Sequence, residues 1–494
     1  MPIMFISTLI ILLVPICLYL RASCRSKNPP VLPTNWPMLH MFPSFIANLH
    51  NLYDYYTLVL ARSGHNFRVH GPPGTGMRFF ITCNPPNARH ILTTNHANFP
   101  KGTEFADIFN IMGGSLFTID GESCRQQRAK AKSILSSPRI ISSMAVYLYG
   151  KVDNNLLPLF TRMAITDTSF DMHELMSRLM FDLAAMPLFG VDPGLLSLDM
   201  PPMDAAVALD TVMEKLMRWL NIGSERKLDT ARMVLREIIG EMMQKRKITT
   251  CRFGHGKEQE SVDIISSFLE DPDYANADLL RAIIISYMLA ARDTIATTLT
   301  WIFCDLAQNP DIVSIIRNEL SPIASRKVAL GASTPVIFEP DETKSLVYLT
   351  ATLYETLRLY PPAPVLLKKV AVDDIMPSGH EVHAGDTIFV SVHSMGRMEG
   401  VWGKDCFDYN PRRWLSDDDN NLRYIPSHKF LAFNAGPRMC LGKDIALMQM
   451  KTVIATAVWN FDVKVVEGQS IQPKPSIILE MKNGLIVKLK KREM

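Results

Sequence analysis

The sequence predicts a mainly α-helical protein with minor β structure (α+β), built as one large unit behind an N-terminal membrane anchor. Three observations predict this fold: an uncharged apolar run at the start, helical periodicity through the middle, and strand-like runs broken by glycine and proline near both ends. Hydrophobic residues make up 47% and charged residues 20% of the 494 positions, which is a globular composition. The chain can therefore bury a large core.

The charge balance and the cysteines exclude several classes of protein. The formal net charge is only +3, so a polyanion partner is not indicated and we expect no nucleic acid binding. The eight cysteines include no CxxC pair and no regular spacing, which argues against a zinc site and against a disulfide framework. The body of the protein is therefore expected in a reducing compartment.

The first twenty residues, MPIMFISTLIILLVPICLYL, carry no charge, and as a helix they would be roughly 30 Å long, enough to cross a bilayer. Arg21, Arg25 and Lys27 follow at once, which is the reverse of the charge order of a cleaved secretory signal. We predict an uncleaved single-pass anchor at 1–20, a basic and proline-rich linker at 21–37, and a catalytic domain at 38–494. A buried core helix at the start of the chain is the alternative.

The rest of the chain changes pattern twice. Up to about residue 100, the stretch FRVHGPPGTGMRFFITCNPP predicts a small sheet, and from about 120 to 365 long apolar-periodic segments predict helices. The last 130 residues or so return to turns and short strands, such as GHEVHAGDTIFVSVHS and GLIVKLKK, with one helix after Cys440. The helices should therefore lie mostly in the middle of the chain.

One cysteine lies in a glycine-rich stretch near the end of the chain, FNAGPRMCLG at residues 433–442. A thiolate that binds a metal must be held at a fixed reach, and glycines allow the sharp turns that leave room for a flat ligand. Gly436 and Gly442 flank Cys440, while Arg438 is placed to neutralise an acidic group of that ligand. Since one cysteine supplies one bond, the other ligands of the metal must come from a cofactor.

This stretch resembles the FxxGxRxCxG signature of the cytochrome P450 haem-thiolate monooxygenases, in which Phe433 supplies the first matching position. Five fixed positions arise by chance in a chain of this length with a probability on the order of 10⁻⁴. The resemblance implies haem b with its iron bound axially by the Cys440 thiolate. It also implies that Phe433, Gly436, Arg438 and Gly442 contribute to haem binding.

A second motif lies in LYETLRLYPPAP, where Glu355 and Arg358 are three residues apart on one face of a predicted helix. A buried ion pair at this spacing is costly unless further groups satisfy it. The ExxR pattern alone is weak, since about one is expected by chance. It resembles the ExxR pair of the family, and FDYNPRRW then places Arg413 where the third member of that triad lies. The resemblance implies a structural role behind the haem.

The third motif, MLAARDTIATT, places Asp293 and Thr294 in the middle of a long apolar helix. Buried polar groups cost free energy unless they have partners or a function. A threonine that bonds back to its own helix beside a surface aspartate is the ordinary interpretation of such a stretch. The stretch also resembles the oxygen-activation segment of the family, which implies that Asp293 and Thr294 deliver protons during oxygen activation.

Two positions depart from the family pattern. Ala291 stands where the family usually has glycine, and its methyl group narrows the groove in which oxygen sits. In ESCRQQR, Cys124 replaces the tryptophan that many relatives carry, while Arg128 is retained in a position to reach a haem propionate. Both departures weigh against efficient oxygen insertion, whereas neither removes a haem ligand.

Within the family, the chain most resembles the plant clan of fatty-acid and alkane hydroxylases, including the branch that couples phenols in norbelladine-type alkaloid synthesis. The resemblance implies an NADPH-cytochrome reductase as electron donor and a hydrophobic small-molecule substrate. It also implies the bilayer of the endoplasmic reticulum, with the catalytic domain facing the cytosol. We favour intramolecular oxidative coupling of an O-methylated norbelladine, because phenolic O–H bonds are weaker than alkyl C–H bonds. Terminal or mid-chain hydroxylation of fatty acids or alkanes is the alternative.

A different class of function is a haem isomerase or dehydratase that needs no reductase, or a haem sensor. Asp293 and Thr294 weigh against this class, because such proteins need no proton relay. By family position, the substrate pocket is expected to be lined by small or apolar residues that ordinary core packing would also explain. These are Tyr287, Ala290, Ala291, Val365, Leu366 and Ile478.

Overall fold

The computed structural model describes residues 32–35, 40–71, 75, 77–204, 207–208, 225–252, 263–274, 276–331, 335–418 and 421–493. The predicted anchor at 1–20 and most of the predicted linker at 21–37 lie outside the described residues. None of the helices in the described part has both the length and the apolar character that a membrane span requires. Helices dominate and the sheets are small, so the prediction of a mainly α fold with minor β structure is confirmed.

The chain divides into two compact units. The sheet unit comprises the chain up to Pro100 together with Val365–Cys406, and the helical unit comprises Lys101–Pro364 together with Phe407–Met494. The strands of the sheet unit are β1 (Asn66–His70), β2 (Arg78–Thr82), β4 (Val365–Lys369), β5 (Asp374–Ile375), β6 (Glu381–Val382) and β7 (Thr387–Ser391). Its helices are α2 (Phe42–Ala47), α3 (Leu52–Arg62), α4 (Pro85–Arg89), α17 (Val392–Met395), α18 (Glu399–Trp402) and the short turns η1 (Leu49–Asn51), η2 (His90–Thr94) and η3 (His96–Asn98).

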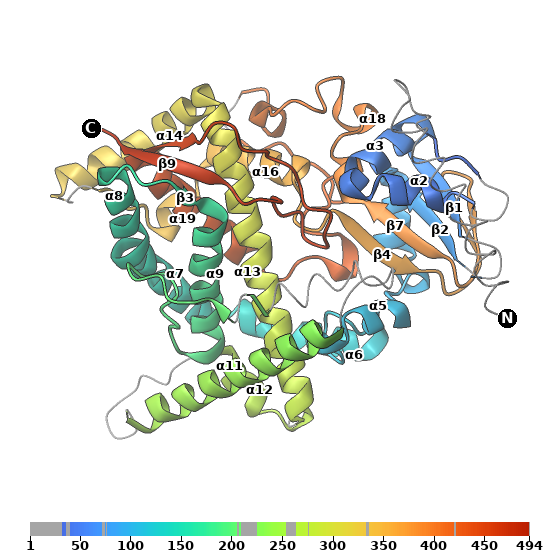
Figure 1. Ribbon diagram of the computed structural model, residues 1–494, viewed down its shortest axis with the longest axis horizontal. Coiled ribbons are helices and arrows are strands. Elements are labelled where there is room, and N and C mark those ends of the chain that lie inside the picture. Colours follow the sequence, from blue (N-terminus) through green and yellow to red (C-terminus); the bar gives the residue numbers. More distant parts are fainter. Residues whose placement is uncertain are drawn as a thin grey trace, which may run out of the picture. The chain divides into compact units, whose positions relative to one another are not determined.

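The main sheet of this unit has the strand order β1-β2-β7-β4 (Figure 1). β1 and β2 form an antiparallel pair within the stretch where the sequence predicted a small sheet, with Asn66 opposite Thr82. The Thr82 hydroxyl donates to the Asn66 side-chain oxygen at 2.7 Å, which fixes the register at that end. β2 then runs parallel to β7, which comes from the far end of the sequence, and β7 pairs antiparallel with β4. Two segments about 300 residues apart in the chain thus share one sheet.

The helical unit contains the long helices. They are α5 (Thr103–Ile108), α6 (Gly121–Leu135), α7 (Pro138–Lys151), α8 (Leu157–Ile165), α9 (Met172–Phe189), α11 (Glu225–Arg252), α12 (Ile264–Leu269), α13 (Ala277–Gln308), α14 (Pro310–Ala329), α15 (Pro340–Thr343), α16 (Val347–Leu359) and α19 (Lys443–Asn460). Short turns η4 (Asn110–Met112), η5 (Val152–Leu156), η7 (Pro272–Tyr274), η8 (Pro411–Trp414) and η9 (Gly436–Arg438) connect several of them. The antiparallel strands β3 (Phe170–Asp171), β9 (Ile486–Lys491) and β8 (Phe461–Val465) form a small sheet in this order.

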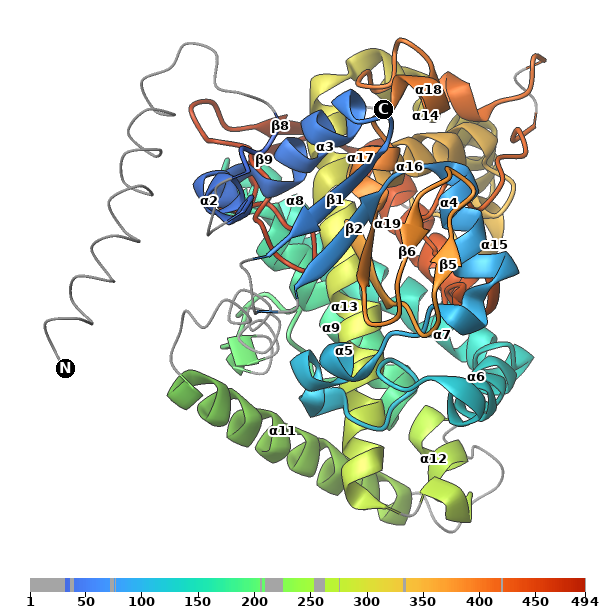
Figure 2. The same ribbon diagram turned by 90° about the vertical axis from the view of Figure 1, so that its right-hand side faces the viewer.

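The 32-residue helix α13 is the longest element, and α9 packs along it (Figure 2). Asn276 caps its start, because the side-chain oxygen accepts from the N–H groups of Asp278 and Leu279 at 2.8 and 3.2 Å. The helix ends before Pro310, whose ring disfavours helical backbone in the preceding residue. Most of its side chains are buried, which explains why the sequence of this helix is apolar on nearly every face.

Helix α19 carries a buried amine, Lys451, whose side chain is 6% exposed. Its Nζ donates to the carbonyl oxygen of Lys344 at 3.0 Å. Burial lowers the pKa of Lys451 from its usual value near 10.5 to about 8, and the charge of Glu319 only partly opposes this shift. The charged amine therefore destabilises the fold wherever it is protonated.

The pH dependence of stability should report this buried amine. Above about pH 8 the folded protein has released the Lys451 proton, while the unfolded chain keeps it until about 10.5, so the free energy of unfolding rises with pH in this window. At about 1.4 kcal/mol per pH unit, the rise amounts to roughly 3 kcal/mol. Chemical unfolding of the wild type and of Lys451→Met between pH 7 and 10.5 isolates the effect as a difference. Parallel curves for the two proteins would contradict it.

Candidate functional site

The cysteine loop, residues 433–442, is closed on itself by backbone hydrogen bonds. The N–H of Cys440 donates to the carbonyl of Phe433 at 2.8 Å, and the N–H of Met439 donates to that of Gly436 at 3.0 Å. Gly436 has a φ of +62°, a left-handed conformation that glycine adopts without steric penalty. The loop therefore holds Cys440 on a short, fixed turn directly before α19.

Cys440 differs from the other described cysteines in exposure. Its side chain is exposed, whereas those of the others with described side chains, Cys83, Cys124, Cys304 and Cys406, are buried. Solvent reaches the thiol even though many protein atoms surround it. A metal or another ligand of suitable shape therefore has access to this sulfur.

The surroundings of Cys440 act on its protonation in both directions. Partial burial has the largest effect and raises the pKa of the thiol, while a hydrogen bond from the backbone of Gly442 and the positive charges of Arg128 and Lys443 lower it. The charge of Asp444 raises the pKa of the same thiol slightly. Since α19 begins at Lys443, its N-terminal dipole also favours a negative sulfur. These groups suit a thiolate that is paired with a cation.

Gly442 is a glycine that the chain itself does not require. Its φ of −93° is open to any residue, and a Cβ added there would meet no protein atom within 4 Å. Neither backbone strain nor packing within the chain thus explains a glycine at this position. A flat ligand that passes close to the turn would explain it, because a side chain at Gly442 would lie in its way.

Two arginines fix the cysteine loop to α6 and to the segment that precedes it. Arg128 of α6 donates through Nη2 to the carbonyl of Met439 at 2.6 Å. Arg438 donates to the carbonyls of Leu116 at 3.1 Å and Ile119 at 2.6 Å. Both arginines predicted to bind the cofactor therefore lie at the loop, and each also has a structural task there.

Cys124, the departure noted in the sequence ESCRQQR, lies on α6 and is 3% exposed. Its sulfur is 3.8 Å from the carbonyl oxygen of Leu116, a long and weak hydrogen bond. The thiol therefore packs against the segment before α6. The space at this position is therefore filled by a small side chain.

Glu355 is the centre of a buried hydrogen-bonded cluster, and its carboxylate accepts five bonds. Arg358 donates to it through Nε and Nη2, both at 2.8 Å, and Arg413 donates through Nε at 2.8 Å. The indole of Trp414 and the backbone N–H of Asn410 donate at 2.9 and 2.8 Å. Because the side chains of Glu355 and Arg358 are fully buried, the pair depends on these additional partners. The cluster joins α16 to η8.

Asp293 and Thr294 take partners on their own helix, α13. The carboxylate of Asp293, which is 5% exposed, forms an ion pair with the neighbouring Arg292 at 3.0 Å. The hydroxyl of the half-buried Thr294 donates to the carbonyl of Ala290 at 2.6 Å. This hydrogen bond to the preceding helical turn uses the only proton of the hydroxyl. The lone pairs of the hydroxyl oxygen can still accept a hydrogen bond from another group.

The predicted pocket residues on α13 differ in their surroundings. Tyr287 packs edge-on against Phe268 of α12, with ring centroids 6.2 Å apart. Ala290 is exposed and Ala291 is half-buried. Together with Thr294, the two alanines leave an open stretch on one face of an otherwise buried helix.

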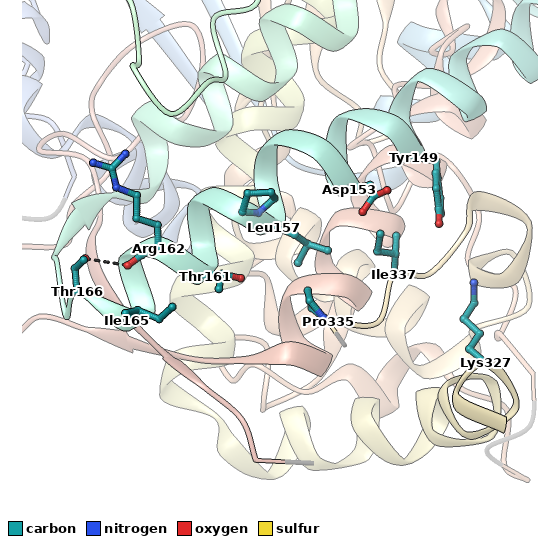
Figure 3. A pocket seen from close by; sticks show the side chains of 11 residues that line it. Tyr149, Asp153, Leu157, Thr161, Arg162, Ile165, Thr166, Lys327, Pro335 and Ile337 are labelled. Carbon is teal, nitrogen blue, oxygen red and sulfur yellow. Dashed lines mark hydrogen bonds between the residues drawn. The ribbon is translucent and has the colours of Figure 1, made fainter. Parts of the chain in front are cut away.

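The other predicted pocket residues are Ile478, which is buried in the helical unit, and Val365 and Leu366, which lie on β4 of the sheet unit. A cavity of about 760 Å³ lies elsewhere on the helical unit, beside α7, η5, α8 and the end of α14 (Figure 3). It contains none of the predicted site residues. Its lining consists of Tyr149, Asp153, Leu157, Pro158, Thr161, Arg162, Ile165, Thr166, Lys327, Pro335 and Ile337.

Sequence reasoning missed two residues of this site. Trp414 follows Arg413 directly, and a tryptophan beside a predicted buried arginine was a usable signal for a further donor. Asp120, which pairs with Arg438 at 2.7 Å, gave no such signal, because an aspartate before a helix is explained by capping alone.

Comparison with known proteins decides the family. The family model described as Cytochrome P450 matches residues 29–489. The chain belongs to the cytochrome P450 family. The resemblance inferred from the cysteine loop and the ExxR pair is therefore confirmed, and this P450 is an oxidoreductase of the monooxygenase type.

Curated relatives of this P450 are plant proteins that match almost from end to end. Noroxomaritidine synthase 2 of Narcissus pseudonarcissus is 34% identical over 496 residues, with 96% of this chain and 94% of that protein covered. Alkane hydroxylase MAH1 of Arabidopsis thaliana is 33% identical over 516 residues, with 99% of each chain covered. Cytochrome P450 86B1 of Arabidopsis thaliana is 34% identical, with 96% of this chain and 88% of that protein covered. The relatives thus include both kinds of enzyme that the sequence suggested.

The family implies a haem cofactor whose iron is bound by a cysteine thiolate, electrons from a redox partner and a hydrophobic substrate. The residues of this P450 fit that cofactor. The exposed thiol of Cys440, the backbone bond from Gly442 and the nearby cations suit a thiolate ligand. The glycine that the chain itself does not require at 442 suits a flat macrocycle.

Proposed function

We propose that Cys440 is the axial thiolate ligand of haem b in this P450. Support comes from its exposure, which no other described cysteine with a described side chain shares, and from the bonds that fix the loop around it. When bound, the haem supplies the oxidising centre that removes hydrogen from the substrate. The remaining cofactor-binding residues are Phe433, Gly436, Arg438, Gly442 and Arg128.

Asp293 and Thr294 hold and pass protons in this proposal. Asp293 is buried and forms an ion pair with Arg292, and its carboxylate, next to Thr294 in the chain, is the group that takes up and releases protons. The Thr294 hydroxyl, half-buried one turn after Ala290, can accept a proton on one side and give up its own on the other. The Glu355, Arg358 and Arg413 cluster has a structural role.

The reaction of this P450 is intramolecular C–C coupling of two phenol rings in an O-methylated norbelladine. One dioxygen, one NADPH and one proton take up the two phenolic hydrogens and give two waters and NADP⁺, so the product is lighter than the substrate by two hydrogens. The similarity to noroxomaritidine synthase 2 supports this assignment. Terminal or mid-chain hydroxylation of long-chain fatty acids or alkanes is the second candidate, which the similarity to alkane hydroxylase MAH1 favours.

The position of Ala291 is the observation that favours coupling over hydroxylation. It is half-buried on α13, three residues before Thr294, where its methyl group takes up space in the stretch assigned to oxygen activation. Hydroxylation must return an oxygen atom to carbon within that space, whereas coupling needs only hydrogen removal. Since phenolic O–H bonds are weaker than alkyl C–H bonds, coupling tolerates the narrower groove better.

A substrate comparison tests the proposed reaction. The full chain in membranes, supplied with an NADPH-cytochrome reductase and NADPH, is incubated with an O-methylated norbelladine, and separately with a long-chain alkane and a fatty acid. We expect a product two hydrogens lighter from the norbelladine and little oxygenated product from the chains. Efficient hydroxylation of the alkane or the fatty acid, with no coupled product, would replace the first candidate by the second.

A matched pair of variants refines this comparison. Ala291→Gly widens the groove and should raise the yield of oxygenated by-products relative to coupling. Ala307→Gly introduces the same flexible residue at a half-buried position near the end of α13, so it controls for loss of helix propensity. An equal product ratio in both variants would show that the Ala291 methyl group does not decide between coupling and hydroxylation.

The proposed partner and location follow from the same assignment. The electron donor is an NADPH-cytochrome reductase, and the anchor at 1–20 places the protein in the membrane of the endoplasmic reticulum with its catalytic domain in the cytosol. A reductase-independent isomerase, dehydratase or haem sensor is distinguished by NADPH consumption. Turnover of a substrate without any NADPH consumption would support that other class.

A further inference from the structure

Asp120 occupies the position of a helix cap but does not act as one. It directly precedes α6, where an aspartate side chain normally accepts from the N–H groups of the first turn. Its side chain makes no such bond, and the following Gly121 has a φ of +68°. The carboxylate is therefore directed to partners outside the helix.

These partners come from two other segments of the helical unit. One carboxylate oxygen of Asp120 accepts from the backbone N–H groups of Lys101 and Gly102, at 2.9 and 3.1 Å. The other oxygen accepts from Nη2 of Arg438 at 2.7 Å. Charge-assisted bonds of this kind are stronger than bonds between neutral groups. One side chain thus joins residues 101–102, the start of α6 and the cysteine loop.

The Arg438 end of this connection is held firmly. Its guanidinium also donates to the carbonyls of Leu116 and Ile119, so three bonds fix its plane two residues before Cys440. Its side chain is 14% exposed and that of Asp120 is 29% exposed, which limits screening by solvent. A displacement of the Asp120 carboxylate would therefore move the cysteine loop.

The Lys101 end is continuous with a cluster of aromatic side chains. The Nζ atom of Lys101 lies over the rings of Phe105 and Phe117, 4.4 and 4.3 Å from their centroids, and donates to the carbonyl of Phe117. Phe109 contacts both rings, with centroid distances of 4.6 Å to Phe105 and 5.2 Å to Phe117. The residue whose N–H group binds Asp120 is therefore the residue that holds these rings together.

We infer that Asp120 is a positioning residue that couples the aromatic segment 101–117 to the loop bearing Cys440. The inference rests on the proposed role of Cys440. A shift of the aromatic segment, such as occupancy by an apolar molecule would cause, changes the Asp120 position, and Arg438 passes the change to the backbone next to the sulfur. Asp120 touches neither substrate nor sulfur and acts only through Arg438 and the amides of Lys101 and Gly102.

Asp120→Asn tests the coupling, because it keeps the size of the side chain and removes its charge. At the Lys101 end of the connection, hydrogen exchange of the amides in segment 101–110 is measured on the haem-free protein. At the Arg438 end, the lifetime of the thiolate signature of the carbon-monoxide complex is measured in mild denaturant. We expect faster exchange and faster loss of the signature, each by about tenfold, as for loss of one charge-assisted hydrogen bond. An effect at one end only would overturn the coupling.

Asp271→Asn is the matched control. Asp271 pairs with Lys130 of the same helix α6 at 2.8 Å, and its side chain is 28% exposed, which is close to the value for Asp120. This variant should leave both readouts at wild-type values, and equal behaviour of the two variants would refute the inference. If Asp120→Asn does not fold, Asp120→Glu decides, since its longer side chain keeps the charge but shifts both contacts, and unchanged readouts in it would refute the coupling.

The two proposals fail in different ways. Hydrogen exchange in the haem-free protein does not depend on the ligand of the iron. If Cys440 proved not to be the ligand, Cys440→Ala would keep whatever signature the wild type has, while the exchange of segment 101–110 would still respond to Asp120→Asn. If the coupling alone were wrong, the wild-type signature would be intact and at least one Asp120 readout would match that of the Asp271 control.

Discussion

Changing Cys440 to alanine is expected to abolish the thiolate signature of the reduced carbon-monoxide complex and to reduce turnover to background. The variant loses the one thiol of the cysteine loop, and the backbone bonds of Phe433 and Gly436 that shape the loop do not depend on the sulfur. The polypeptide should therefore fold while binding haem weakly. Absorption spectra of the purified variant after haem supplementation measure both effects.

Cys124→Ala is the matched control for this change. It also removes a thiol near Arg128, but that thiol is buried against the carbonyl of Leu116 and gives no access to a ligand. Its thiolate signature should match that of the wild type. If Cys440→Ala retained the signature and Cys124→Ala lost it, the assignment of the ligand would move to α6.

The sequence predicted those parts of the fold that depend on neighbouring residues. The small sheet in which β1 and β2 pair was predicted because strand-like runs alternate with glycine and proline turns in this stretch. Helix α13 was predicted because MLAARDTIATT lies within a long apolar segment with helical periodicity. The parallel pairing of β2 with β7 was not predicted, because the local sequence of a strand does not indicate which strand about 300 residues away will pair with it.

The same distinction applies to the site. The glycines, the arginine and the cysteine of the loop were found because all lie within ten residues, and Glu355 and Arg358 because one helical turn separates them. Asp120 was missed because its partners, Lys101 and Arg438, belong to other segments. A local pattern assigns such an aspartate to the nearest helix, and only the tertiary structure shows that its charge is used elsewhere.

Glu355→Gln should be the most destabilising single change in the buried contact between α16 and η8. It removes the carboxylate charge that faces Arg358, whose side chain is fully buried, and Arg413, which is 9% exposed. Removal of one partner from a buried ion pair costs about 3–5 kcal/mol. Because a domain is stable by only about 5–15 kcal/mol, the variant should yield little folded protein at growth temperature. Chemical unfolding of the haem-free protein measures the loss without reference to activity.

A second pair of an arginine and a carboxylate shows whether the loss of stability comes from burial of the pair or from the ion pair itself. Arg317 binds Asp462 at 2.7 Å, but the Asp462 side chain is 44% exposed, so Asp462→Asn should cost no more than about 1 kcal/mol. The double variant Glu355→Gln with Arg358→Met should be more stable than the sum of its single changes predicts. The second change removes the buried Arg358 charge, whose carboxylate partner the first change has neutralised. Simple additivity would instead show that the loss comes from packing and from the bonds of Trp414 and Asn410.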